Sequence, residues 1–92
     1  MNIQKLFDII LNRKESMPAN SYVADLLNQG TDRIAQKVGE EAVEVVIASK
    51  GQKKNQIIHE VADLWFHTLV LLANHDLKPD DIYDELGKRN KK

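Results

Sequence analysis

Two consecutive segments decide the fold of this chain, and together they form residues 31–74, TDRIAQKVGEEAVEVVIASKGQKKNQIIHEVADLWFHTLVLLAN. Residues 54–74 carry apolar side chains on nearly every side of a helix with about 3.6 residues per turn. These side chains belong to Ile57, Ile58, Val61, Leu64, Trp65, Phe66, Leu69, Val70, Leu71 and Leu72. Residues 32–50 have a narrower apolar side, made of Ile34, Val38, Ala42, Val45 and Val46. Because Gly51 separates the two segments, we expect an antiparallel helical hairpin.

Three shorter helices are expected around the hairpin, at residues 2–14, 21–29 and 79–88. Gly30 is a suitable end for the second helix, and Thr31 is the expected N-cap of the helix at residues 32–50. No run of alternating apolar and β-branched residues suggests a strand. The predicted fold class is therefore all-α, a helix bundle built from one long hairpin.

The composition limits the chain to one domain and a few classes of function. A chain of 92 residues is expected to form a single domain over residues 1–92. With 13 Lys plus Arg against 14 Asp plus Glu there is no basic excess, so we expect no nucleic-acid partner. The absence of cysteine excludes disulfides and thiolate metal sites, and it favours the cytoplasm. Residues 61–73 are too short and too polar for a membrane span of about 20 apolar residues.

The apolar character of residues 54–74 also predicts a partner. A helix that is apolar on all sides must be covered on all sides. The two short helices at residues 2–14 and 21–29 offer too little surface for this. We therefore expect a homodimer in which a second copy of the chain completes the bundle.

Carboxylates gather on the two helices of the predicted hairpin. At 100° per residue, Glu40, Glu41 and Glu44 share one side with Lys37. The two acids of the second helix have i, i+3 spacing, so they also point the same way. The expected cluster consists of Glu40, Glu41, Glu44, Glu60 and Asp63. Unpaired carboxylates are costly to bury, so a lysine or a metal ion is expected beside them. Oxygen ligands without a His or Cys partner suit Mg²⁺ or Mn²⁺.

An Mg²⁺ site of this kind indicates a phosphate ester or anhydride as substrate, because Mg²⁺ in proteins commonly binds substrate phosphates as well as carboxylates. It would lower the pKa of a bound water, and a free carboxylate could take that proton. Blander interpretations stay open: a solvated acidic side, Lys37 as a simple i, i+4 partner of Glu41, and Gly39 as a merely tolerated glycine. His67 is expected to be a hydrogen-bonded core residue, and His59 and His75 surface or helix-end residues.

Two acidic motifs of this chain resemble those of a known superfamily. Residues 40–44, EEAVE, are followed after 15 residues by EVAD at residues 60–63. This pattern is similar to the signature of the all-α, MazG-like nucleotide pyrophosphohydrolases.

Longer stretches resemble one branch of that superfamily, the phosphoribosyl-ATP pyrophosphatases of the second step of histidine biosynthesis. The stretches are SYVADLLNQG at residues 21–30, IAQKVGEEA at 34–42 and HEVADL at 59–64. The resemblance covers residues 6–89.

The resemblance implies an enzyme that hydrolyses the α–β phosphoanhydride of phosphoribosyl-ATP to phosphoribosyl-AMP and pyrophosphate. It also implies Mg²⁺, a nucleotide substrate and a helical homodimer. The metal ligands it implies are Glu41, Glu44, Glu60 and Asp63. It makes Glu40 and Glu41 the catalytic residues, with Glu40 available for a second metal or for water activation. Lys37 and Arg33 are where substrate phosphates could be met.

Two competing hypotheses remain at this point. A MazG-like enzyme that removes damaged or non-standard nucleoside triphosphates would carry the same acidic motifs, and only residues 21–37 separate the two. A non-catalytic helical dimerisation module would use the acids to bind a cation or a basic partner.

Overall fold

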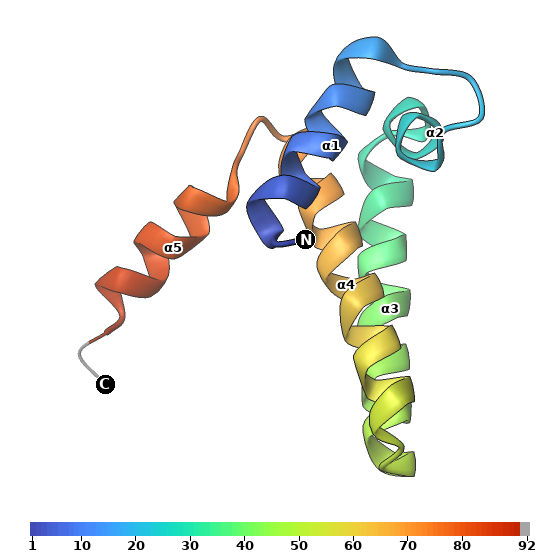
Figure 1. Ribbon diagram of the computed structural model, residues 1–92, viewed down its shortest axis with the longest axis vertical. Helices are drawn as coiled ribbons and strands as arrows, with labels where there is room; N and C mark the ends of the chain where they lie inside the picture. Colours follow the sequence, from blue (N-terminus) through green and yellow to red (C-terminus); the bar gives the residue numbers. More distant parts are fainter. Residues whose placement is uncertain (91–92) are drawn as a thin grey trace.

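The computed structural model describes residues 1–90 and consists of helices joined by short connections (Figure 1). No strand occurs within residues 1–90, so the predicted all-α class is confirmed. The helices are α1 (Ile3–Ser16), α2 (Tyr22–Gln29), α3 (Thr31–Gly51), α4 (Lys54–Asn74) and α5 (Pro79–Lys88).

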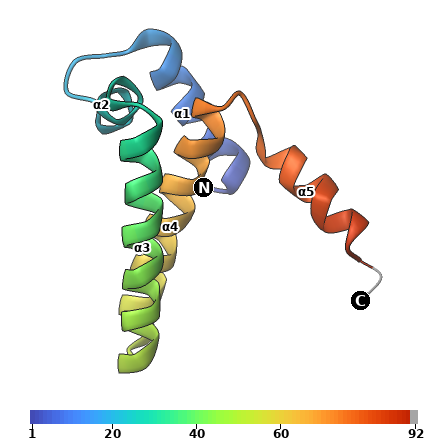
Figure 2. The same cartoon turned by 180° about the vertical axis from the view of Figure 1, so that it is seen from behind.

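The two long helices form the predicted antiparallel hairpin. Both α3 and α4 have 21 residues, and they run side by side in both views (Figures 1 and 2). The turn between them uses Gln52 in the left-handed conformation, with φ 58°, and its N–H donates to the Ser49 carbonyl oxygen at 3.3 Å. The carboxylates of residues 40–44 and 60–63 therefore lie on neighbouring helices.

The expected N-cap of α3 is wrong, because Gly30 serves both α2 and α3. Its N–H donates to the Leu26 carbonyl oxygen at 3.1 Å, and its own carbonyl oxygen accepts from the Ile34 N–H at 3.1 Å. Its φ of 92° is a conformation that glycine adopts without strain. Gly30 is the only residue between the two helices, so Thr31 becomes the first residue of α3. Its hydroxyl oxygen accepts a hydrogen bond from the Asn74 side chain at 2.9 Å.

The core lies at one end of the hairpin, where α1 and α2 pack against it (Figure 1). The buried side chains of this core are Phe7, Ile10, Val23, Leu26, Ile34, Leu69, Val70, Leu72 and Ala73. The other end of the hairpin extends beyond α1 and α2 (Figure 2). There, four apolar side chains are more than half exposed, and we call them the apolar tip: Val43, Val46, Ile47 and Ile58.

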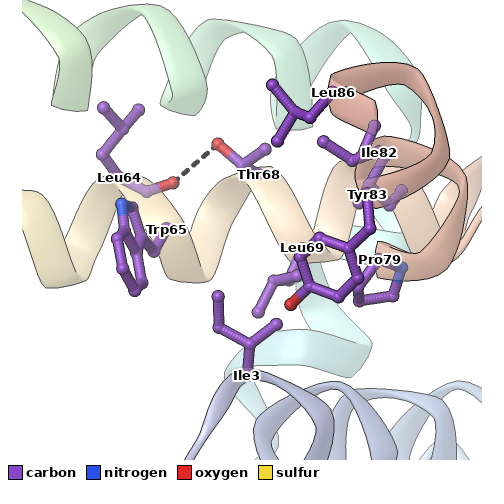
Figure 3. A pocket seen from close by; sticks show the side chains of 10 residues that line it. Ile3, Leu64, Trp65, Thr68, Leu69, Pro79, Ile82, Tyr83 and Leu86 are labelled. Carbon is purple, nitrogen blue, oxygen red and sulfur yellow. Dashed lines mark hydrogen bonds between the residues drawn. The ribbon is translucent and has the colours of Figure 1, made fainter. Parts of the chain in front are cut away.

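Helix α5 points away from the bundle and leaves a groove beside α4 (Figures 1 and 3). The groove has a volume of about 400 Å³. Most of the lining residues are apolar: Ile3, Leu64, Trp65, Thr68, Leu69, Leu72, Pro79, Ile82, Tyr83 and Leu86. The Thr68 hydroxyl donates to the Leu64 carbonyl oxygen at 2.7 Å, so this polar group is already satisfied (Figure 3).

Lys14 of α1 forms hydrogen bonds with the C-terminal end of α4, the end that connects to α5. Its Nζ donates to the Ala73 carbonyl oxygen at 2.7 Å and to Asp76 Oδ1 at 2.8 Å. The hydrogen bond from Lys14 holds the pKa of the Asp76 carboxyl below its usual value of 3.8. The Lys14 ammonium also stabilises the C-terminus of α4, because the last carbonyl oxygens of a helix lack intrahelical partners and carry partial negative charge. Among the described residues, no helix combines the length and the apolarity that crossing a membrane requires.

Candidate functional site

The acidic pair of α4 lies on one side of that helix, as the i, i+3 spacing predicts. The Glu60 side chain is 21% exposed and the Asp63 side chain 41% exposed. His59 joins them: its Nε2 lies 3.4 Å from Asp63 Oδ2 and 4.0 Å from Glu60 Oε1. Within residues 1–90, only these three residues form a group of potential metal ligands whose donor atoms all lie within 4.8 Å of one another.

His59 is exposed, as expected, but the sequence interpretation missed its position beside the carboxylates. Its side chain is 71% exposed and still points along α4 toward Asp63. The i, i+4 spacing between the two residues is the signal that could have identified this contact. A histidine nitrogen therefore lies beside the α4 half of the predicted oxygen cluster, and the predicted ligand set itself stays a prediction.

On α3, the predicted cations and the predicted catalytic carboxylates form ion pairs with one another. Lys37 Nζ lies 3.3 Å from Glu41 Oε1, and these side chains are only 21% and 12% exposed. Arg33 Nη1 lies 3.8 Å from Glu40 Oε1 at a more exposed position. Lys37 thus has the i, i+4 contact that was one of its two interpretations.

Glu44 stands apart from these contacts. Its side chain is exposed and forms no ion pair within 4.0 Å in the described part of the chain. Neither Glu44 nor Glu41 belongs to the close group of potential ligands on α4. The predicted residues therefore lie in two groups, one on each helix of the hairpin.

The α4 carboxylates fit a divalent cation by their charge and donor type. Within residues 1–90, Glu60 and Asp63 have no Lys or Arg partner within 4.0 Å, in contrast to Glu40 and Glu41. The two carboxylates carry two negative charges, which a divalent ion would neutralise. Carboxylate oxygens are also the ligands that Mg²⁺ and Mn²⁺ prefer.

The prediction for His67 is confirmed, because it is a hydrogen-bonded core residue. It is 5% exposed, and its Nδ1 lies 2.7 Å from the Asp63 carbonyl oxygen. A carbonyl can only accept, so Nδ1 carries the proton and Nε2 accepts from the Tyr22 hydroxyl at 2.8 Å. The Phe66 ring packs edge-on against His67 with centroids 5.1 Å apart. These contacts join α2 to the turn of α4 that carries Asp63.

Gly39 borders open space on the outer side of α3. A Cβ placed there would meet no atom within 4 Å. Within the described residues of a single chain, no other helix therefore approaches Gly39 closely.

The fold and the site first define a class: an all-α protein whose helical hairpin carries a candidate site for a divalent cation and a phosphate. A family model described as Phosphoribosyl-ATP pyrophosphohydrolase matches residues 3–90, which include all of the helices. The chain belongs to the phosphoribosyl-ATP pyrophosphohydrolase family, and the resemblance seen in the sequence is confirmed.

Relatives from distant organisms carry the same name, "Phosphoribosyl-ATP pyrophosphatase". The one from Geobacter sulfurreducens is 52% identical over 95% of this chain and 81% of its own length. The one from Neisseria gonorrhoeae is 54% identical over 87% of this chain and 75% of its own length. The one from Saccharolobus islandicus is 48% identical over 97% of this chain and 95% of its own length. These proteins are hydrolases by name.

Proposed function

We propose that this chain hydrolyses the α–β phosphoanhydride of phosphoribosyl-ATP to phosphoribosyl-AMP and pyrophosphate, in the second step of histidine biosynthesis. The observation that carries this proposal is a relative of that name, 52% identical over 95% of the chain. The same observation favours this substrate over the damaged nucleotides of the alternative MazG-like enzymes. A non-catalytic dimerisation module gains no support from it.

The proposed metal is Mg²⁺, with Mn²⁺ as a substitute, and its proposed ligands are Glu41, Glu44, Glu60 and Asp63. The carboxylates of α4 support this assignment because no Lys or Arg within residues 1–90 neutralises them. When bound, such an ion neutralises phosphate charge and lowers the pKa of a coordinated water.

Lys37 is proposed to change partners during the reaction. Without a metal its ammonium neutralises Glu41 at 3.3 Å, in the most enclosed ion pair of the described residues. Once Glu41 serves as a metal ligand, Lys37 is released and can donate to a phosphate oxygen of the substrate. Arg33 lies beside Glu40 on the same helix and is proposed to meet a second phosphate.

Glu40 and Glu41 are the proposed catalytic carboxylates. Glu40 has a half-exposed side chain, 48% exposed, so an attacking water can reach it. We propose that Glu40 accepts the proton of that water, since a general base must lie within hydrogen-bond reach of the proton it takes. Glu41 is proposed to contribute to catalysis as a ligand of the metal.

The test is a pyrophosphate-release assay with Mg²⁺ and four substrates: phosphoribosyl-ATP, ATP, dCTP and dUTP. Each charge-assisted bond to the additional ribose phosphate contributes about 1.5–3 kcal/mol. Two such bonds correspond to a preference of about 10² to 10⁴ in kcat/KM for phosphoribosyl-ATP over ATP. Equal turnover of both substrates would refute the proposal and support the alternative enzyme.

Lys37→Met tests the source of this preference. We expect the variant to lose about tenfold or more of the ratio of kcat/KM values, because one charge-assisted bond is missing. Lys5→Met is the matched control, since Lys5 is an exposed residue of α1. A ratio that stays the same in Lys37→Met would remove Lys37 from substrate recognition.

We also propose that the chain is a homodimer, because much apolar surface of the hairpin is uncovered. In addition to the apolar tip, Trp65 is 54% exposed beside the groove of α4 and α5. Leu69 and Leu72 are 5% and 6% exposed and lie in the core of the single chain. Their replacement would unfold the protomer itself and would not report on the dimer.

Ile58→Glu and Trp65→Glu are better tests of the dimer, because both side chains lie outside that core. Sedimentation velocity at micromolar concentration should show a dimer for the unmodified chain and its loss in both variants. Ile9→Glu is the control, because Ile9 is an exposed apolar residue of α1 that lies outside the buried core. A folded monomer of the unmodified chain would refute the proposal.

We place the enzyme in the cytoplasm, which the absence of cysteine supports.

A further inference from the structure

A second cavity lies where α1 and the start of α2 meet α4, apart from the groove beside α5 (Figure 1). Its volume of about 420 Å³ suits a small-molecule ligand. We propose that this cavity binds the adenine base and the additional ribose phosphate of phosphoribosyl-ATP, with Arg13 as the residue that binds this phosphate. The proposal rests on the proposed function and assigns the binding site of the substrate's far end.

The walls of the cavity offer apolar and aromatic contacts. Leu6, Ile9 and Ile10 line it from α1, where their i, i+3, i+4 spacing places them on one side of the helix. Tyr22 of α2 and Phe66 of α4 also line it, and their rings are stacked with centroids 6.0 Å apart. Tyr22 is 49% exposed, so part of its ring is free to stack on a planar base.

Arg13 adds a positive charge that no carboxylate neutralises. It lines the cavity from the same side of α1 as the apolar residues. Within residues 1–90, Arg13 has no carboxylate within 4.0 Å, whereas Lys37 and Arg33 each have one. A guanidinium binds phosphate through two parallel, charge-assisted hydrogen bonds. The cavity therefore suits a ligand with both an aromatic and an anionic part.

The position of Phe66 places the cavity next to the acidic side of α4. At 100° per residue, Phe66 lies about 60° around the helix from Asp63 and about 4.5 Å along its axis. Trp65, which lines the groove beside α5, lies about 160° from Asp63. The cavity therefore borders the acidic side of α4, whereas the α5 groove faces away from it.

Tyr22 connects the cavity to the turn of α4 that carries Asp63. Its ring lines the cavity, and its hydroxyl donates to His67 Nε2 at 2.8 Å. His67 Nδ1 in turn donates to the Asp63 carbonyl oxygen at 2.7 Å. Only two side chains thus separate the cavity from this turn. One nucleotide can place its triphosphate at the acidic cluster and its base and additional ribose phosphate in the cavity.

The experiment measures the binding of AMP to the full chain without divalent metal, by calorimetry and by NMR shifts of backbone amides. AMP is the probe because it combines adenine with a ribose 5′-phosphate, as the far end of the substrate does. Without metal, the carboxylates of the acidic cluster repel a phosphate, so AMP binding reports on the cavity. We expect the largest shifts at Arg13 and Tyr22, and shifts confined to the hairpin, or none at all, would overturn the proposal.

Arg13→Met tests the phosphate contact without disturbing the core, because Arg13 is an exposed residue of α1. We expect the variant to bind AMP about tenfold or more weakly, since a charge-assisted contact is lost. Lys5→Met is the matched control, because Lys5 is an exposed cation of α1 that does not line the cavity. Equal AMP affinity of Arg13→Met and the unmodified chain, or an equal loss in Lys5→Met, would overturn the proposal.

Two substitutions of Tyr22 test the contact with the base. Tyr22→Phe keeps the ring and should bind AMP like the unmodified chain. Tyr22→Leu removes the ring and should bind AMP about fivefold or more weakly. Equal affinity of the two variants would refute the assignment of the base to this cavity. If Tyr22→Leu does not fold, Arg13→Met decides alone.

Failure of this proposal is distinguishable from failure of the proposed function. If the chain releases no pyrophosphate from phosphoribosyl-ATP but Arg13→Met loses AMP affinity, the enzyme assignment fails and the nucleotide cavity stands. In an active enzyme, Arg13→Met should also lower kcat/KM for phosphoribosyl-ATP by about tenfold or more. If the chain is active and Arg13→Met keeps its AMP affinity or its kcat/KM, the cavity assignment fails and the enzyme assignment stands.

Discussion

Tyr22→Phe tests the contact that joins α2 to the turn of α4 carrying Asp63. The substitution removes only the hydroxyl group that donates to His67 Nε2 at 2.8 Å. The ring stays in place and keeps its stacking contact with Phe66, whose centroid is 6.0 Å away. Any effect on stability therefore comes from the lost hydrogen bond.

The magnitude follows from the burial of the two partners. His67 is 5% exposed, and a buried acceptor without a partner costs about 1–3 kcal/mol. Tyr22 is 49% exposed, so water can reach the vacated position and limits the loss to about 1–2 kcal/mol. For a domain of this size, 1 kcal/mol shifts Tm by about 4–8 °C, so we expect Tm to fall by about 4–16 °C.

Thermal unfolding followed by circular dichroism is the assay, with Tyr83→Phe as the control. Tyr83 is 50% exposed on α5, and its hydroxyl forms no hydrogen bond to any residue from 1 to 90. Removing its hydroxyl should change stability by less than about 0.5 kcal/mol. A Tyr22→Phe protein with the Tm of the unmodified chain, or a loss in Tyr83→Phe as large as that in Tyr22→Phe, would refute the reasoning.

Three further predictions concern the acidic cluster, α3 and the end of α4. Glu44→Gln and Asp63→Asn should lower pyrophosphate release by about 10² or more, while the Tm without metal stays equal or rises because like charges no longer repel; unfolding with unchanged specific activity would contradict this. Gly39→Ala should raise Tm by about 4–8 °C, because alanine is about 1 kcal/mol more favourable in a helix and its Cβ meets open space within 4 Å; a lower Tm, or loss of the dimer in sedimentation, would indicate that a partner approaches there. Asp76→Asn should lower Tm at pH 7, and its difference from the unmodified chain should shrink as pH falls below 3.8. The reason is that Lys14 lowers the folded-state pKa of Asp76, so the stability of this contact is complete above 3.8 and lost as pH falls through the lowered value. A difference in Tm that is constant from pH 7 to pH 2.5 would exclude this linkage.

Helix boundaries were predictable wherever a local signal marks them. Pro79 at the first helical position and the apolar run that ends at Asn74 are such signals, and α5 and α4 have the predicted bounds. The start of α3 was predicted one residue too late, because Gly30 is shared by two helices. Sequence rules assign each cap to one helix, whereas the path of the backbone decides whether one residue serves both.

The candidate site was predictable in its residue types and only partly in its contacts. Helical spacing placed Glu60 and Asp63 on one side of α4 and Lys37 near Glu41. It did not reveal that His59 faces the same carboxylates, because an exposed side chain can adopt several rotamers with the same spacing. Pairing of Arg33 with Glu40 spans two helical turns and depends on the extended conformation of both side chains.

The sequence by itself determined the helical periodicity, the hairpin and the chemical identity of the acidic cluster, because these depend on the order of residues along single helices. Its apolar excess on residues 54–74 also indicated that a single chain could not cover the hairpin. Only the tertiary structure decided which part stays uncovered. Helices α1 and α2 cover one end of the hairpin, where Leu69 and Leu72 are buried (Figure 1). Trp65 stays exposed beside the groove that α5 leaves, and Ile58 stays exposed at the opposite end of the hairpin. Packing depends on which helices distant in sequence contact each other, and the periodicity of a single helix does not determine those contacts.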